Sequence, residues 1–226
     1  MKILAIDTAA ALCAACVFGT ETDEELSRHV LDLGKGHAEH VMAVIEAALK
    51  TAGLGYEALG AVAVSVGPGS FTGVRVGVSA ARGLALARSV PAIGISTLEA
   101  LGAEARVTIP GRNVLVALGQ RAPSLFAAGF DSEGHILLEP QSQSAQWLAE
   151  WASAEKAVVY GAAARFVAEA GVHSLEIHPA GATADILTFA RLAAEKGAGS
   201  EPPKPLYLRA PDAAPQQNFA LPRKEG

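Results

Sequence analysis

The stretch AVAVSVGPGSFTG, residues 61–73, contains the features that decide the fold. Its first part, residues 61–66, is an apolar run of the kind found in strands buried on both faces of a sheet. A loop with three glycines and one proline follows over residues 67–73, and the spacing beyond it predicts a helix over about 72–87. Strand, tight turn and helix in this order indicate an α/β protein.

The glycine loop differs from the two common phosphate-binding fingerprints. Its last spacing is one residue too long for the G-x-G-x-x-G motif, and no lysine follows the final glycine as in a P-loop. Free backbone N–H groups at the start of a helix can nevertheless hold an anion. The glycines can equally serve backbone geometry alone, so both interpretations stay open.

The residues around this loop predict the order β-β-β-α-β-α-β for the first half of the chain, and the second half repeats the order more faintly. Two copies of one order indicate a duplication, and the last thirty residues, with six of the twelve prolines, predict an extended tail. The predicted strands of the first half are 2–7, 12–18, 26–31, 61–66 and 92–95, with helices over 37–52 and 72–87. Those of the second half are 114–118, 124–130, 135–138, 157–160 and 175–178, with helices over 145–152, 162–170 and 183–195.

Composition limits the class of protein further. The 226 residues are 50% hydrophobic and 18% charged, so they can form a packed core. The net charge is −5 and the basic residues do not cluster, so the chain is not expected to be the main receptor of a nucleic acid. The first apolar run is too short for a secretory signal, and no run reaches the length of a membrane span. We therefore expect a cytoplasmic protein.

Cys13 and Cys16 form a C-x-x-C pair, a spacing also found in redox and zinc sites. They lie in a predicted strand, where residues three apart face opposite sides and are too far apart for a disulfide. We expect two small apolar strand residues.

The helix predicted over 72–87 carries small residues at every fourth position, namely Gly73, Gly77 and Ala81. They share one face and would let another helix approach closely. Glycine within a helix is unfavourable by about 1 kcal/mol relative to alanine, so tight packing is the expected compensation for Gly77 and Gly83. The spacing does not decide whether the packing is internal or with another subunit.

Several segments together resemble the TsaB (YeaZ) family. They are ILAIDT at 3–8, GHAEH at 36–40, VGPGSFTGVRVG at 66–77, GISTLEAL at 94–101 and, more weakly, PLYLR at 205–209. The resemblance implies an α/β fold of the actin-like ATPase superfamily (ASKHA, ribonuclease-H-like), with duplicated β-β-β-α-β-α lobes of which the second is reduced. The expected lobes are residues 1–104 and 105–226, the latter with the proline-rich tail.

The family also implies a role. TsaB-like proteins are similar to the catalytic protein TsaD and support it in placing the threonylcarbamoyl group on adenosine 37 of tRNAs that read codons beginning with adenine. TsaD-like proteins carry H-x-x-x-H where this chain has Thr97 and Leu101, and a hydroxyl with a hydrocarbon does not hold a divalent metal. The segment at 161–164 also lacks a glycine-rich adenine loop. We expect a non-catalytic accessory subunit, a pseudoenzyme, with no catalytic residues and no metal ligands of its own.

The expected partners are TsaD in a heterodimer, TsaE in a larger complex, a second copy when the chain is alone, and tRNA mainly through TsaD, with no membrane. No cofactor is expected on this chain itself, with ATP and magnesium placed at the interface of the complex. The expected partner interface is His37, His40, Val41, Val44, Gly73, Val74, Gly77 and Ala81, and the candidate nucleotide cleft is Asp7, Thr8, Gly69 and Ser70.

The alternative is a stand-alone metal- or nucleotide-dependent hydrolase of the same fold. His37 and His40 form H-x-x-H, but no third ligand is evident. Ser70 lacks the G-x-S-x-G elbow of a serine hydrolase. The chain also departs from the family at Gly119-Gln120, where an aspartate is usual, and at Ala81-Arg82.

Overall fold

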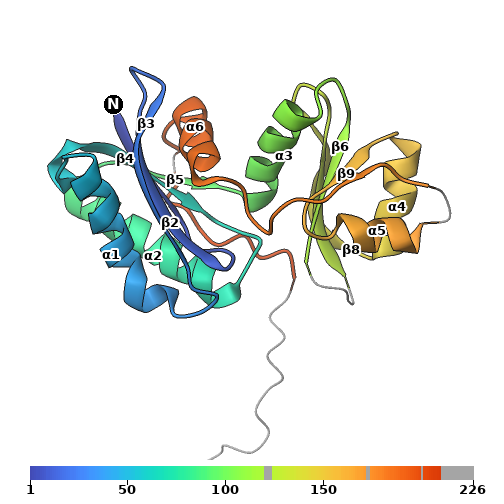
Figure 1. Ribbon diagram of the computed structural model, residues 1–226, viewed down its shortest axis with the longest axis horizontal. Coiled ribbons are helices and arrows are strands. Elements are labelled where there is room, and N and C mark those ends of the chain that lie inside the picture. The colour runs from blue at the N-terminus through green and yellow to red at the C-terminus, as the bar shows by residue number, and fades with distance from the viewer. Residues whose placement is uncertain (120–123, 172–173, 200, 210–226) are drawn as a thin grey trace, which may run out of the picture.

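Two five-stranded mixed sheets form the framework of the protein (Figure 1). The computed structural model describes residues 1–119, 124–171, 174–199 and 201–209. In the first sheet β1, β2 and β3 are antiparallel, while β1, β4 and β5 are parallel. Its order is β3-β2-β1-β4-β5, formed by β1 (Lys2–Asp7), β2 (Leu12–Gly19), β3 (Glu24–Asp32), β4 (Leu59–Ser65) and β5 (Ala92–Ile95).

The second sheet repeats this arrangement strand for strand, which confirms the predicted duplication. Three antiparallel strands are again followed by two parallel ones. The order is β10-β9-β6-β7-β8, formed by β6 (Val114–Leu118), β7 (Leu125–Phe130), β8 (Ile136–Gln143), β9 (Val158–Tyr160) and β10 (Ile177–His178). This duplicated topology is the actin-like fold that the sequence predicted.

The helices complete each copy of the repeat. The first copy contains α1 (His37–Thr51), the short 3-10 helix η1 (Tyr56–Ala58), α2 (Phe71–Arg88) and α3 (Thr97–Thr108). The second contains α4 (Ala145–Ala154), α5 (Ala164–Ala170) and α6 (Ile186–Lys196). The second copy is reduced, since α5 has 7 residues where α2 has 18.

Strand β1 lies at the centre of the first sheet, and its two faces belong to two different cores. Leu4 and Ile6 pack under α1 and α2. Ile3 and Ala5 belong to the core on the other face, which also contains residues of α3, α6 and the second sheet. Because both faces of β1 are buried, its sequence is continuously apolar rather than alternating.

The last helix of each copy packs against the sheet of the other copy (Figure 1). Helix α6 lies on β1, β2, β4 and β5, while α3 lies on β6 and β7, and the two helices contact each other. The central core of the molecule therefore joins both sheets through these helices. The predicted division between residues 104 and 105 falls within α3 and stays a prediction.

Helix α3 was missing from the predicted elements, although its start carries a clear signal. Ser96 and Glu99 form a reciprocal capping box at its first turn. Helix α6 was predicted from residue 183 but begins at Ile186, because Asp185 is its N-cap and accepts a hydrogen bond from the N–H of Leu187. The predicted tail from residue 210 onward lies outside the described residues.

Cys13 and Cys16 are free and buried on opposite faces of β2, as predicted. Burial raises the pKa of the Cys13 thiol to about 11 and that of Cys16 to about 12. Neither thiol is therefore a nucleophile near neutral pH. Among the described helices none is long and apolar enough to cross a membrane.

Phe189 of α6 offers a test of the helix exchange, since its ring is fully buried in the core that joins the two sheets. Phe189→Ala should lower the free energy of unfolding by about 3–5 kcal/mol. Val107→Ala, at a position that is 84% exposed, should change it by less than about 0.5 kcal/mol. Urea denaturation measures both, and equal small effects would contradict the buried position of α6.

Candidate functional site

The glycine loop packs on the turn that follows β1. The N–H of Ser70 donates to the carbonyl of Ala9 over 2.6 Å, and the hydroxyl of Thr8 donates to the carbonyl of Gly73 over 2.7 Å. A Cβ added to Gly69 would lie 2.2 Å from the Ala9 oxygen, and one added to Gly73 would lie 2.0 Å from the Thr8 oxygen. The two backbones therefore touch directly, and only glycine leaves room for this contact.

Helix α2 turns its small-residue face inward. A Cβ on Gly77 would lie 2.5 Å from the Thr8 hydroxyl oxygen, and Ala81 is fully buried. The close approach predicted for this face is thus made to the chain's own first turn. Gly83 differs from the others, because a Cβ there would meet nothing within 4 Å, so the tight packing expected for it is absent.

Most of the residues predicted as a partner interface lie inside the molecule. His40 alone is exposed, whereas the other seven are buried. The inward positions follow from helical spacing, because the apolar side chains of α1 and α2 face the sheet that they cover. The seven buried residues are His37, Val41, Val44, Gly73, Val74, Gly77 and Ala81.

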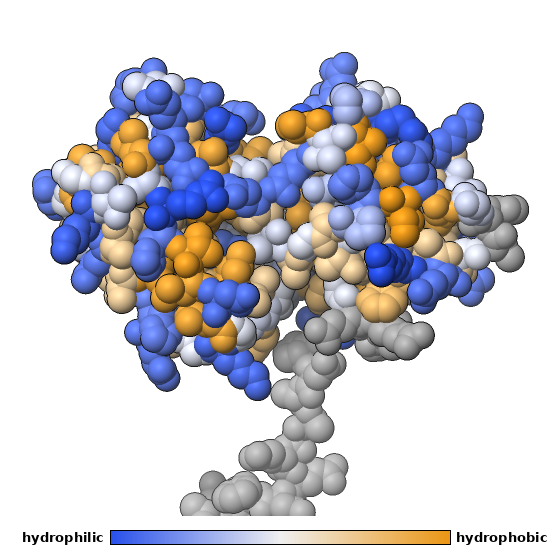
Figure 2. Space-filling model, viewed as in Figure 1, coloured by the Kyte–Doolittle hydropathy of each residue, from blue (hydrophilic) through white to orange (hydrophobic). Residues whose placement is uncertain are grey.

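The surface that α1 and α2 present to solvent consists of other residues. Leu86 near the end of α2 is 83% exposed, and Met42 of α1 is 42% exposed. Gly83 lies one turn before Leu86 and is exposed as well. Figure 2 shows hydrophobic residues at the surface of both lobes. We call Met42, Gly83 and Leu86 the helical face.

The four residues of the predicted nucleotide cleft lie together where β1 ends. Asp7 is 1% exposed and accepts hydrogen bonds from the N–H of Ala9 (2.9 Å) and the hydroxyl of Thr183 (2.6 Å). Burial raises its pKa, and these hydrogen bonds offset only part of the effect. Asp7, Thr8, Gly69 and Ser70 are thus joined to the chain's own groups, and nucleotide binding at them stays a prediction.

The two positions that carry histidines in TsaD-like proteins are buried here. Thr97 is fully buried, and its hydroxyl lies 3.1 Å from the hydroxyl of Ser65 at the end of β4. Leu101, one turn later on α3, belongs to the central core. In the described part of the chain no three histidine, cysteine or acidic side chains are placed to hold a metal ion.

His37 and His40 have different surroundings, although they lie one turn apart on α1. The His37 ring is 6% exposed, and its Nε2 has no hydrogen-bond partner among the described residues. His40 faces solvent. Ser70 is the N-cap of α2, where its hydroxyl accepts from the N–H of Gly73 (3.3 Å). Its hydroxyl thus has the structural role of a helix cap.

In the second lobe, a short loop takes the place of the glycine loop. Gly161 has a φ of +112°, and a Cβ there would lie 2.6 Å from the Ala117 carbonyl oxygen. Helix α5 then begins after Ala163, which offers no side-chain cap. The predicted departure at Gln120 lies outside the described residues, while Arg82 is exposed on α2.

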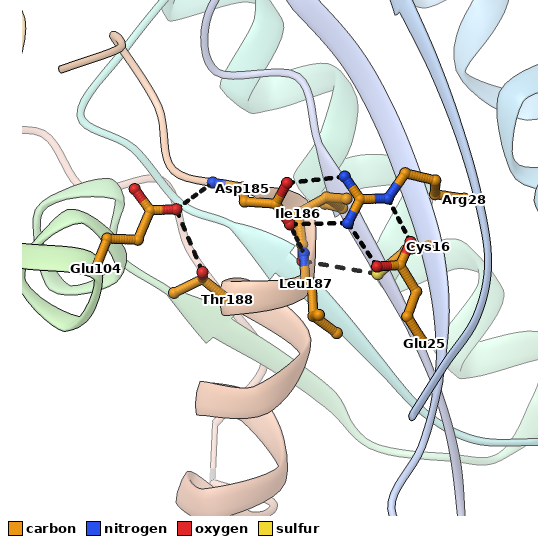
Figure 3. A network of polar contacts seen from close by, with 8 residues as sticks. All are labelled: Cys16, Glu25, Arg28, Glu104, Asp185, Ile186, Leu187 and Thr188. Carbon is orange, nitrogen blue, oxygen red and sulfur yellow. Dashed lines mark hydrogen bonds and ion pairs between the residues drawn. The ribbon is translucent and has the colours of Figure 1, made fainter. Parts of the chain in front are cut away.

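A polar network joins the two lobes on the face of the first sheet that is opposite α1 and α2 (Figure 3). Arg28 of β3 pairs with Glu25 and donates two hydrogen bonds, of 2.8 and 3.1 Å, to the carboxylate of Asp185. Glu104 of α3 accepts from the N–H of Asp185 and from the Thr188 hydroxyl. Burial raises the pKa of Asp185, but the hydrogen bonds from Arg28 and from the N–H of Leu187, together with the charge of Arg28, outweigh it, so the net pKa is lowered. The network fixes the start of α6 between β3 and α3.

Residues 203–209 form a strap that crosses from one lobe to the other. The N–H of Leu206 donates to the carbonyl of Val66 in the first lobe. The Tyr207 hydroxyl accepts from Nε of Arg75 over 2.8 Å. Arg209 donates to the backbone and side-chain oxygens of Ser124 in the second lobe, both over 2.7 Å. The strap therefore ties the glycine loop and α2 to the second sheet.

Comparison with known proteins agrees with this geometry. The family model "TsaD: tRNA N6-adenosine threonylcarbamoyltransferase" matches residues 32–140. The chain is 33% identical over 133 residues to the tRNA threonylcarbamoyladenosine biosynthesis protein TsaB of Escherichia coli strain K12, covering 59% of this chain and 56% of that protein. It is 33% identical over 106 residues to the protein of the same name from Bacillus subtilis strain 168, covering 47% and 45%. The chain thus spans about half the length of these curated relatives.

A solved structure supports the fold over nearly the whole chain. YeaZ from Pseudomonas aeruginosa superposes with a TM-score of 0.74 at 24% identity, covering 92% of this chain and 99% of that one. The duplicated sheets and the TsaD-like segment define the class, a two-lobed actin-like protein related to TsaD. Within that class its sequence is similar to the TsaB proteins of Escherichia coli and Bacillus subtilis over about half of its length.

Two parts of the site were not predicted from the sequence. Thr183 is 176 residues from Asp7 along the chain, so no local pattern connects them. Arg75 and Tyr207 lie in segments that resemble the family, and their pairing across 132 residues was equally invisible. For the end of the chain, the prolines predicted only an extended tail.

The glycines of α2 give a matched pair of substitutions. Gly73→Ala forces a methyl group against a backbone oxygen and should lower the free energy of unfolding by about 1–3 kcal/mol or more. Gly83→Ala meets open space and should raise it by about 0.5–1 kcal/mol through helix propensity. Thermal and urea denaturation distinguish the signs, and stabilisation by both substitutions would contradict the packing of α2 on the first turn.

The buried carboxyl of Asp7 predicts a pH dependence. Its folded-state pKa is raised, so ionisation opposes folding, and stability is lost as the pH rises through that pKa. Asp7→Asn should therefore gain stability relative to the wild type as the pH rises from about 4 to about 7. Urea denaturation across this range measures the difference, and a constant difference at all pH values would refute the assignment.

Proposed function

We propose that the chain is a non-catalytic partner of TsaD in the formation of threonylcarbamoyladenosine at position 37 of tRNA. The observation that carries this proposal is the pair Thr97 and Leu101, a buried hydroxyl and a core hydrocarbon at the positions of the two histidines of TsaD-like proteins. These side chains offer no ligand set for a divalent metal. The names of the curated relatives, tRNA threonylcarbamoyladenosine biosynthesis proteins, point to the same pathway.

The helical face is the proposed docking surface for TsaD. Leu86 and Met42 expose large apolar side chains there, and Gly83 provides a position where a partner helix can approach the backbone closely. Retaining glycine at an exposed position within α2 is unfavourable by about 1 kcal/mol in the isolated chain, and a close contact with a partner explains it. His40 lies on the exposed side of α1 and belongs to this proposed interface.

The same face would serve a second copy of the chain when TsaD is absent. TsaE joins the larger complex, tRNA is held mainly by TsaD, and ATP with magnesium lies at the interface of the complex. These partners are what the resemblance to the TsaB proteins implies. Asp7 and Thr8 are hydrogen-bonded to the chain's own Ala9, Thr183 and Gly73. Its place of action is the cytoplasm.

The helical face can be tested with two variants that differ only in position. Leu86 and Val107 are 83% and 84% exposed, and each lies in the last turn of its helix, where a cation is tolerated. Leu86→Lys should weaken binding to TsaD by about 10-fold or more, because it places a charge in an apolar contact. Val107→Lys should leave binding unchanged.

Calorimetry with TsaD of the same organism measures the affinity, and analysis of tRNA nucleosides after depletion of the chain measures the modification. Loss of threonylcarbamoyladenosine on depletion, restored by the wild type and by Val107→Lys but not by Leu86→Lys, supports the proposal. Normal modification without the chain would refute it. Sustained ATP or peptide hydrolysis by the isolated chain would instead support the stand-alone hydrolase.

A further inference from the structure

Five side chains along the strap form a row of aromatic and guanidinium groups, which we call the strap face. It consists of Phe71, Arg75, Phe126, Tyr207 and Arg209. The Arg75 guanidinium lies 3.6 Å from the centroid of the Phe71 ring and 5.6 Å from that of Tyr207. The Arg209 guanidinium lies 5.5 Å from the Phe126 ring. Every cation–π contact found among the described residues belongs to this row.

The two arginines of the strap face differ from five other basic residues of the described lobes in having no carboxylate partner. Arg28, Arg112, Arg191, Lys196 and Lys204 each lie within 4.0 Å of a carboxylate. In the described part of the chain neither Arg75 nor Arg209 has such a partner, although the protein carries a net charge of −5. Their positive charge is therefore available to an anion. The contacts with the aromatic rings and the hydrogen bond from Arg75 to Tyr207 hold the planar guanidinium groups in place.

The rings of the strap face are only partly used by the fold. Phe71 is 49% exposed and Tyr207 is 53% exposed, with ring centroids 5.7 Å apart. If these rings served only to hold the strap on the body, full burial would stabilise the fold more than half-exposure does. An unstacked base can stack on half-exposed rings, and the phosphate of the same nucleotide can pair with an unpaired guanidinium beside them.

We infer that the strap face contacts an unpaired segment of the tRNA anticodon loop once the chain is assembled with TsaD. This inference rests on the proposed function and adds a direct RNA contact by this chain. The exposed rings of Phe71 and Tyr207 lie beside each other and offer stacking positions to bases of a single strand. The row would add to the binding of an RNA that is held elsewhere in the complex.

The test uses the assembled complex and a labelled anticodon stem-loop, with affinity measured at several salt concentrations. Tyr207→Leu removes a ring and Arg75→Gln removes a charge. Each should weaken RNA binding by about 5-fold or more. Arg75→Gln should also reduce the slope of log K against log salt by about 0.7, the value for one phosphate contact of a single strand.

Trp147→Leu and Arg112→Gln are matched controls on the second lobe, where the side chains are 37% and 43% exposed, and both should bind as the wild type does. Wild-type affinity for RNA in Tyr207→Leu and Arg75→Gln would overturn the inference. So would a loss of TsaD binding in these variants, because the face would then be a protein contact. A second measurement, photocrosslinking of thiouridine-labelled RNA, should place Tyr207 in the crosslinked peptide, and its absence there would also overturn the inference.

The wild-type complex separates this inference from the proposed function. If it assembles and modifies tRNA while the two variants bind RNA normally, only the strap contact is refuted. If the wild-type chain neither binds TsaD nor supports modification, the proposed function fails and the inference fails with it.

Discussion

The direct contact between two backbones at the end of β1 determines how the first lobe is built. Gly69 and Gly73 meet the carbonyl oxygens of Ala9 and Thr8, and no side chain fits between them. Because α2 starts at this contact, its direction across the sheet is set there, and its small-residue face is pressed inward. The residues on the opposite side of α2, such as Arg82, Gly83 and Leu86, are therefore exposed.

The same contact occupies polar groups at the candidate cleft. Thr8 and Ala9 give their polar groups to the glycine loop, and Asp7 is capped by Thr183 from the second lobe. Thr97 and Ser65 pair with each other. Buried polar groups that satisfy one another stabilise a closed cleft, since each would be unfavourable if left alone.

Periodicity and turn residues predicted the strands and most helices, because local patterns determine those elements. Helix α3 was not predicted, because its apolar residues were interpreted as part of a family motif. Ser96 and Glu99 nevertheless mark its start. The spacing of Gly73, Gly77 and Ala81 identified a close contact correctly but could not say with what. Partners that lie far apart in the chain, such as Asp7 with Thr183 or Arg75 with Tyr207, depend on how the lobes meet, and no single segment carries that information.

The reciprocal placement of α3 and α6 has an evolutionary corollary. In a solitary ancestral half, one face of the sheet would have no helix packed on it, and the last helix would have no sheet to pack against. Two identical halves that traded those helices would have solved both problems, as in a domain-swapped dimer. Fusion of two such halves would make the exchange intramolecular. Cutting this protein between its halves should consequently yield fragments that are insoluble apart and that recover structure only when mixed.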